Sequence, residues 1–246
     1  MVSNNWVYSG AVSVLLALGL ASAAQADLTH RYSFKDGTKD SVGKVDATLK
    51  GAAKIADGKL TLDNGDKTSA DADLAYVEFG TPILPKEGSV SIAMWFSGKE
   101  MGQFSRLLDI GGKDDTSGTA FIYLTARTGD DGSRAAISAT DAGSKSNVDG
   151  VRLDDGKPHL ATVVIDGTAK KLHLYVDGKE VGTATDLGDN TLDKVKQDHA
   201  WIGKSAFDTD PGLSGTINEL RIYNEALTAD QIAAIAKAGA DALPAK

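Results

Sequence analysis

The chain has 246 residues, no cysteine and a formal net charge of −8. Without cysteine it can form no disulfide bond, and its negative charge argues against nucleic acid and anionic membranes as partners. Asp supplies 28 of the 34 acidic residues, and Asp is common in turns and unfavourable in helices. This composition favours an all-β fold with many short strands.

An apolar run near the start of the chain predicts export. Residues 11–23 are apolar but too few to span a bilayer comfortably, and residues 24–26 (Ala-Gln-Ala) match the small-residue pattern of a signal-peptide cleavage site. We therefore interpret residues 1–26 as a signal peptide and residues 27–246 as one domain of a secreted or periplasmic protein, with no membrane insertion after cleavage. A retained anchor is the alternative, because the first ten residues contain no Lys or Arg.

Alternating apolar and polar residues predict a series of strands and one helix. The strands are expected at 29–34, 59–62, 75–79, 89–97, 104–110, 119–126, 134–139, 148–152, 159–165, 170–176, 180–185, 200–203 and 215–223. The helix is expected at 229–237, where Thr228 can cap its start and Gly239 can end it. Residues 36–72 and 111–118 are rich in Gly, Asp, Lys and Thr, so we expect mainly loops there.

Two neighbouring strands indicate the kind of sheet. Residues 159–165 are apolar on both faces, which is typical of a strand inside a sandwich. Residues 172–176 alternate with a period of two, and the Asp-Gly pair at 177–178 suits a tight hairpin turn. We expect two antiparallel sheets packed face to face. The residues expected in the core are Trp95, Leu174, Val176, Leu220 and Ile222.

Several motifs, taken in order, resemble the laminin-G-like, concanavalin A-like family. They are His-Arg-Tyr-Ser-Phe at 30–34, Asp-Ser-Val-Gly at 40–43, a Trp-containing strand at 89–96, Val-Asp-Gly-Lys at 176–179, Ile-Gly at 202–203, and Gly-x-Ile-x-Glu-Leu-Arg-Ile-Tyr-Asn-x-Ala-Leu-Thr-x-x-x-Ile from Gly215. The similarity spans roughly residues 28–236. It implies an all-β, two-sheet antiparallel jelly-roll sandwich with one short C-terminal helix. It implies no single activity, because this superfamily contains lectins, adhesion modules, glycosidases and lyases.

No motif in the sequence indicates a catalytic site, so we name no catalytic residue. A retaining glycosidase needs two carboxyl groups about 5–5.5 Å apart, and the six Glu residues lie singly along the chain. The four His residues are also dispersed, without the close spacing of a zinc site. An enzyme whose acids come from separate loops remains an alternative.

Aromatic side chains are the candidate ligand contacts. We name Tyr76, Phe104, Tyr123 and Phe207 as candidates for stacking against a sugar ring, although each could instead be packed inside the protein. Trp95 and Trp201 lie in strand motifs that the resemblance places in the core, so neither is a candidate.

The resemblance also implies a structural calcium ion between the first loop and a late strand. The matching positions are Asp40 and the pair Asn218-Glu219. The family commonly has Asp-Glu at that pair, so Asn218 removes one carboxylate ligand. The alternative is that Asp40 caps its own turn and Glu219 pairs with Arg221 or with a neighbouring strand. The acidic loop 208–210 is a second candidate for the ion.

The function that these observations favour is that of an exported binding module for a carbohydrate or another cell-surface polymer. The first alternative is a carbohydrate-active enzyme, a glycosidase or polysaccharide lyase, on the same fold. The second is a protein-binding adhesion or structural module. The sequence indicates neither the ligand nor the oligomeric state.

Overall fold

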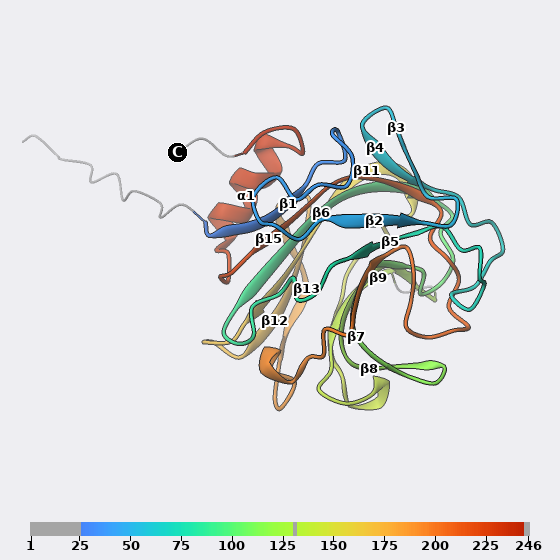
Figure 1. Ribbon diagram of the computed structural model, residues 1–246. Coiled ribbons are helices and arrows are strands. Elements are labelled where there is room, and N and C mark those ends of the chain that lie inside the picture. Colours follow the sequence, from blue (N-terminus) through green and yellow to red (C-terminus); the bar gives the residue numbers. More distant parts are fainter. Residues whose placement is uncertain (1–25, 130–131, 244–246) are drawn as a thin grey trace, which may run out of the picture.

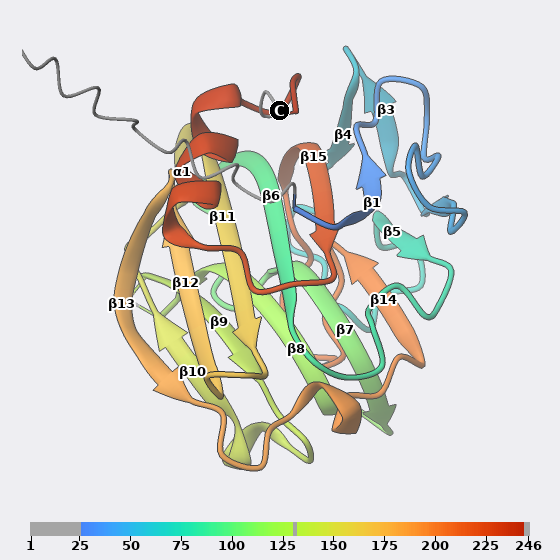
Figure 2. The same cartoon turned by 90° about the vertical axis from the view of Figure 1, so that its left-hand side faces the viewer.

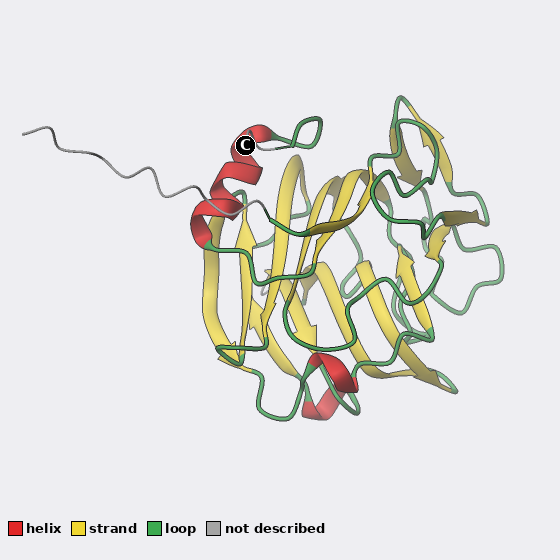
Figure 3. Cartoon of the chain, turned by 60° about the vertical axis from the view of Figure 1, so that its left-hand side comes forward, coloured by secondary structure: helices red, strands yellow, loops and turns green. Residues whose placement is uncertain are grey.

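The computed structural model describes residues 26–129 and 132–243. Residues 1–25 of the predicted signal peptide therefore lie outside the described residues. Two antiparallel sheets pack face to face, which confirms the predicted jelly-roll sandwich (Figure 1). Strands form both layers of the sandwich, as the yellow arrows in Figure 3 show.

The two sheets are here called sheet A and sheet B. The strand order in sheet A is β13 (Lys179–Asp186), β12 (Lys171–Val176), β11 (Asp155–Asp166), β6 (Val90–Lys99), β15 (Gly215–Tyr223), β4 (Lys59–Leu62) and β3 (Lys54–Ala56), with β1 (Leu28–Tyr32) also paired to β15. The order in sheet B is β10 (Ser146–Asp149), β9 (Gly132–Ile137), β8 (Ser117–Thr128), β7 (Arg106–Asp114), β14 (His199–Ile202), β5 (Tyr76–Phe79) and β2 (Ala47–Lys50). Two short 3-10 helices, Ala142–Ser144 and Leu192–Lys194, connect strands.

The main core lies between the two sheets. Four of the five predicted core residues are buried in it, as expected from their alternation along β12 and β15. They are Leu174, Val176, Leu220 and Ile222. Trp95 is also buried, as predicted, but it belongs to a second apolar cluster on the outer face of sheet A and not to the core between the sheets.

The helix α1 (Ala229–Ala238) covers that second cluster (Figure 2). Thr228 and Gln231 form a capping box at its start, and Gly239 follows its end with a φ of 79°. The helix packs on β11, so both faces of this strand are buried, which explains its continuous apolar sequence. Ala26 and Ala240, near the two ends of the described chain, pack against the same cluster.

The turn between β12 and β13 has the predicted conformation. Asp177 has a φ of 50° and Gly178 a φ of 84°, both in the left-handed region that a two-residue hairpin turn requires. The hairpin therefore follows directly from the Asp-Gly pair, and it fixes how β12 and β13 pair at the edge of sheet A.

The prediction that residues 36–72 and 111–118 form mainly loops was partly wrong. Residues 36–72 contain the short strands β2 and β3 in addition to the predicted β4, and residues 111–118 continue β7 and β8 into one long hairpin. The glycines of this hairpin reflect close packing. A Cβ atom on Gly111 would lie 2.7 Å from the Cβ atom of Phe121, so the strand needs glycine at this position.

We expect Thr228→Ala to destabilise the fold by about 1 kcal/mol, because the first turn of α1 loses its side-chain cap. Urea unfolding at neutral pH measures the effect. Thr228→Ser keeps the hydroxyl and should retain most of the stability. Equal losses in both variants would mean that the cap does not contribute.

Candidate functional site

The outer face of sheet B, which points away from the core, carries a row of polar and aromatic side chains. Residues that are paired across antiparallel strands project to the same face. The pairing places Glu78 of β5 beside Trp201 of β14, Trp201 beside Asp109 of β7, and Asp109 beside Tyr123 of β8. These four side chains therefore lie on one surface that crosses the middle of the sheet.

Trp201 lies on this outer face, and its expected place in the core was wrong. Its neighbours Ala200 and Ile202 are buried in the core, so the period of two turns Trp201 outward, where it is half-buried. The imidazole of His199 stacks on the indole, with the ring centroids 3.8 Å apart and the planes 16° from parallel. The signal in the sequence was the alternation in His-Ala-Trp-Ile, which puts the two aromatic rings on one face.

Tyr76 and Trp201 form a half-buried aromatic pair, here called the platform. Their ring centroids are 6.1 Å apart in an edge-to-face arrangement. The indole Nε1 donates to the Glu78 carboxylate at 3.4 Å, and Lys50 forms an ion pair with the same carboxylate at 2.8 Å. The hydrogen bond from Lys50 is the main cause of the lowered pKa of Glu78. The Nζ atom of Lys204 lies 4.7 Å from the Tyr76 centroid and 5.2 Å from the Trp201 centroid.

The other three predicted stacking residues meet around the guanidinium group of Arg106. Its Cζ atom lies 4.0 Å from the ring centroid of Tyr123, 5.6 Å from that of Phe207 and 6.0 Å from that of Phe104. Tyr123 is buried, whereas Phe104 and Phe207 are half-buried. The structure thus brings three of the four candidates into one cluster, and the fourth, Tyr76, lies in the platform.

Buried ion pairs hold this arrangement together. Asp109 accepts hydrogen bonds from Arg106 at 3.3 Å, from His199 Nε2 at 2.9 Å and from the backbone N–H of Ala206 at 3.2 Å. Arg106 also pairs with Asp210 at 2.9 Å. Burial raises the pKa of Asp210, and the charge of Arg106 opposes that effect. The loop that carries Ala206 and Asp210 is therefore fixed over the outer face of sheet B.

His199, Arg106 and Tyr123 are residue types that a polysaccharide lyase would place in an open groove. Here their exposed fractions are only 6%, 2% and 3%, so they do not reach a polymer at the surface. Their contacts show that they support the loop and the platform.

Asp40, the first residue predicted to bind calcium, is surrounded by hydrogen-bond donors. Its carboxylate accepts from His30 Nδ1 at 2.6 Å and from the backbone amides of Arg31 and Gly43 at 3.0 and 2.9 Å. Burial on its own would raise the pKa of Asp40, but the hydrogen bonds from His30 and these amides outweigh it, so the pKa lies below its ordinary value. Asp40 thus caps the turn that follows β1.

Glu219, the second predicted ligand, is buried between two arginines. Arg31 binds its carboxylate through Nε and Nη2 at 2.9 and 3.0 Å, and Arg221 contacts it through Nε. Asn218 lies at a bulge, where the pairing of β15 with β6 shifts. Within residues 26–129 and 132–243, no three His, Asp or Glu side chains are grouped as a metal site would need. The carboxylates of Asp40 and Glu219 already accept hydrogen bonds from His30 and Arg31, so this arrangement does not fit a calcium ion. Calcium binding stays an untested prediction.

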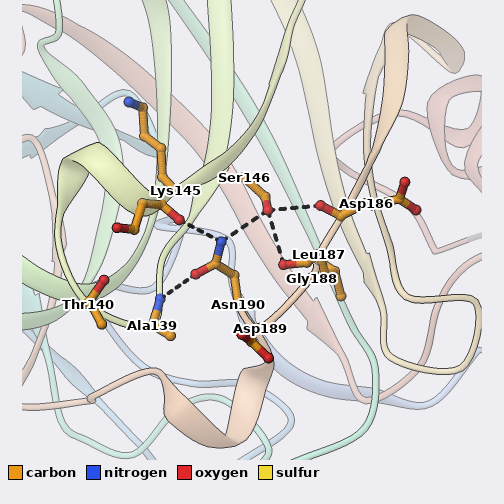
Figure 4. Close-up of a pocket in the computed structure, with 10 residues that line it drawn as sticks. Ala139, Thr140, Lys145, Ser146, Asp186, Leu187, Gly188, Asp189 and Asn190 are labelled. Carbon is orange, nitrogen blue, oxygen red and sulfur yellow. Dashed lines mark hydrogen bonds between the residues drawn. The ribbon is translucent and has the colours of Figure 1, made fainter.

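A pocket of about 470 Å³ lies away from all these residues (Figure 4). The Asn190 side chain crosses it, accepting from the Ala139 amide and donating to Ser144 O and Ser146 Oγ. The Ser146 hydroxyl in turn donates to Asp186 O. Because these groups satisfy each other, the pocket ties strand connections together, and we do not choose it as the candidate site.

The family model described as "Concanavalin A-like lectin/glucanases superfamily" matches residues 71–233. None of the curated proteins matches the sequence. A similar solved structure is domain 4 of AbnA, a GH43 extracellular arabinanase from Geobacillus stearothermophilus, in complex with arabinotriose. Its TM-score is 0.66 at 19% identity, over 85% of this chain and 98% of that one.

Two further solved structures share the fold. The CBM40 of the Ruminococcus gnavus IT-sialidase, bound to α2,3 sialyllactose, has a TM-score of 0.51 at 17% identity, over 60% of this chain and 82% of that one. The binding domain of botulinum neurotoxin DC, in complex with rat synaptotagmin II, has a TM-score of 0.62 at 12% identity, over 86% of this chain. This chain spans only 51% of that neurotoxin domain.

We expect Asp109→Ala to destabilise the protein by about 3–5 kcal/mol. The substitution leaves the buried side chains of Arg106 and His199 without their hydrogen-bond acceptor. Guanidinium chloride unfolding at neutral pH measures the loss. Asp208→Ala is the matched control, since Asp208 pairs with Lys113 nearer the surface, and the expected change there is at most about 1 kcal/mol. Similar losses in both variants would contradict the central role of Asp109.

The Asp40 carboxylate should stabilise the fold in a pH-dependent way. Its folded pKa is lowered, so its contribution is full above the ordinary value of 3.8 and is lost as the pH falls through the folded pKa. Asp40→Asn should therefore lower the melting temperature at pH 7, and the difference from the parent should shrink below about pH 4. A constant difference across this range would refute the assignment.

The same melting experiment, run with calcium and with a chelator, tests the predicted ion. From the donors around Asp40 and Glu219 we expect equal melting temperatures. A rise with calcium that Asp40→Asn abolishes would instead establish the site that the sequence predicts.

Proposed function

This chain belongs to the concanavalin A-like lectin/glucanase superfamily, and from that premise we propose that it is a carbohydrate-binding module. The proposed binding surface is the outer face of sheet B. The observation that carries the proposal is the platform, in which the half-buried rings of Tyr76 and Trp201 lie side by side next to a carboxylate.

The chemistry of the platform suits a sugar. A pyranose presents C–H groups on its ring faces and hydroxyl groups around its edge, so it needs an apolar surface bordered by hydrogen-bonding groups. Tyr76 offers the aromatic surface, and Glu78 offers carboxylate oxygens that can accept from hydroxyls. His199 stacks on Trp201 and so fixes the orientation of the indole before a ligand arrives, which lowers the entropy cost of binding.

The aromatic cluster at Arg106 extends the surface. Phe104 and Phe207 are half-buried and lie against the same guanidinium group as the buried Tyr123. Two separate aromatic contacts on one sheet face suit an oligosaccharide better than a single sugar. The neighbours bound to arabinotriose and sialyllactose support this ligand class.

We further propose that the protein is secreted or periplasmic, on the basis of the predicted signal peptide. Within the described residues, no helix is both long enough and apolar enough to cross a membrane. The extracellular arabinanase domain with a similar fold supports this location.

A glycan array followed by calorimetry on the bound glycan tests the proposal. We expect Tyr76→Ala to weaken binding about tenfold or more, because a central aromatic contact of an interface is lost. The matched control is His173→Ala, which removes a half-buried ring from the outer face of sheet A and should leave the affinity unchanged.

Three results would contradict the proposal. Folded protein that binds no glycan would exclude carbohydrate as the ligand class, and would favour a protein partner such as the one seen with the neurotoxin domain. Unchanged affinity in Tyr76→Ala would place the binding surface elsewhere. Release of reducing sugar from the bound glycan would identify an enzyme instead of a binding module.

A further inference from the structure

The lysine at the platform has no acidic partner, unlike its neighbours. Lys50 pairs with Glu78, and Lys113 pairs with Asp208. Within the part of the chain that the structure describes, Lys204 makes neither an ion pair nor a hydrogen bond. Its ammonium group lies instead over the rings of Tyr76 and Trp201. Lys204 is therefore a cation without a direct ion-pair partner in a chain that carries −8, although the more distant carboxylates of Asp208 and Glu78 attract it.

The surroundings of Lys204 make this arrangement unusual for a surface lysine. The side chain is half-buried, and burial is the main cause of its lowered pKa, followed by repulsion from Lys113, while attraction by Asp208 and Glu78 partly offsets both effects. A partly desolvated ammonium group normally has an acceptor or a counter-charge, because water no longer stabilises it fully. Contact with the faces of Tyr76 and Trp201 supplies part of that stabilisation and leaves the three N–H donors available.

We propose that Lys204 selects acidic sugars, by binding the anionic group of a saccharide that stacks on the platform. The ligand class is a sugar with a carboxylate or a sulfate ester. This inference rests on the proposed function, because it assumes that the platform binds a saccharide.

The flexibility of lysine makes this role compatible with stacking. The ammonium group of Lys204 now lies over the phenol ring of Tyr76, and a sugar that stacks on Tyr76 would take this space. The four-carbon side chain of Lys204 can swing aside and meet a substituent at the edge of the sugar. The nearby carboxylates of Glu78 and Asp208 are each paired with a lysine of their own, Lys50 and Lys113, and charges farther away than about 8 Å are largely screened at physiological salt.

Pairs of saccharides that share a backbone and differ in one group test the proposal. The pairs are oligogalacturonate and its methyl ester, sialyllactose and lactose, and a sulfated galactoside and its unsulfated form. The wild-type protein should bind the acidic member of at least one pair about tenfold more tightly. The lysine ammonium is a compact charge without bidentate geometry, so it can pair with a carboxylate or with a sulfate. Comparison of the carboxylate pairs with the sulfate pair therefore establishes which of the two anions binds.

Lys204→Met keeps the apolar stem and removes the charge. We expect this variant to lose the preference for the acidic member, so that the acidic and the neutral member of each pair bind with similar affinity. Lys179→Met is the matched control, because Lys179 is exposed at the start of β13 in sheet A and its loss changes the net charge equally. The control should keep the preference, and higher salt should reduce the preference in the wild type and in the control alike.

The outcomes separate this inference from the proposed function. Equal binding of both members by the wild type, or an intact preference in Lys204→Met, would overturn the role of Lys204 while carbohydrate binding stands. Failure of folded wild-type protein to bind any member would remove the proposed function itself, and this inference with it.

Discussion

The candidate surface depends on one buried carboxylate, that of Asp109. It joins Arg106, His199 and the backbone of Ala206, which come from three different segments of the chain. Through Arg106 it positions the aromatic cluster, and through His199 it fixes the orientation of Trp201. Because an unpaired charge in a buried place is strongly unfavourable, these groups must be ordered together. The surface is therefore prepared before a ligand binds.

The sequence predicted the strands of the sandwich well, because a strand with one buried face must alternate. It did not indicate what covers the opposite face of each strand. Trp95 and Trp201 both lie in strands and both face away from the main core, but α1 covers Trp95 and leaves Trp201 half-exposed. That difference follows from where the helix packs, which is a tertiary contact that local periodicity does not contain.

The candidate site was predicted in its residue types but not in its arrangement. Phe104, Tyr123 and Phe207 are far apart in sequence, and only the pairing of the strands and the loop after β14 brings them to one guanidinium group. In the calcium prediction, the alternative pairing of Glu219 with Arg221 or with a neighbouring strand is confirmed, since Arg221 and Arg31 of β1 both bind its carboxylate. The sequence did not indicate which neighbouring strand supplies the second partner, because this depends on the pairing of β1 with β15, two strands at opposite ends of the chain.

Ala26 and Ala240 pack on the outer face of sheet A, so both described chain ends lie on the side of the sandwich away from the platform. Anything joined to either end, whether another domain, a cell envelope or a solid support, would leave the outer face of sheet B pointing outward. Copies that are tethered side by side would then present parallel arrays of platforms. Even weak single contacts would add up on a repetitive polymer through effective concentration.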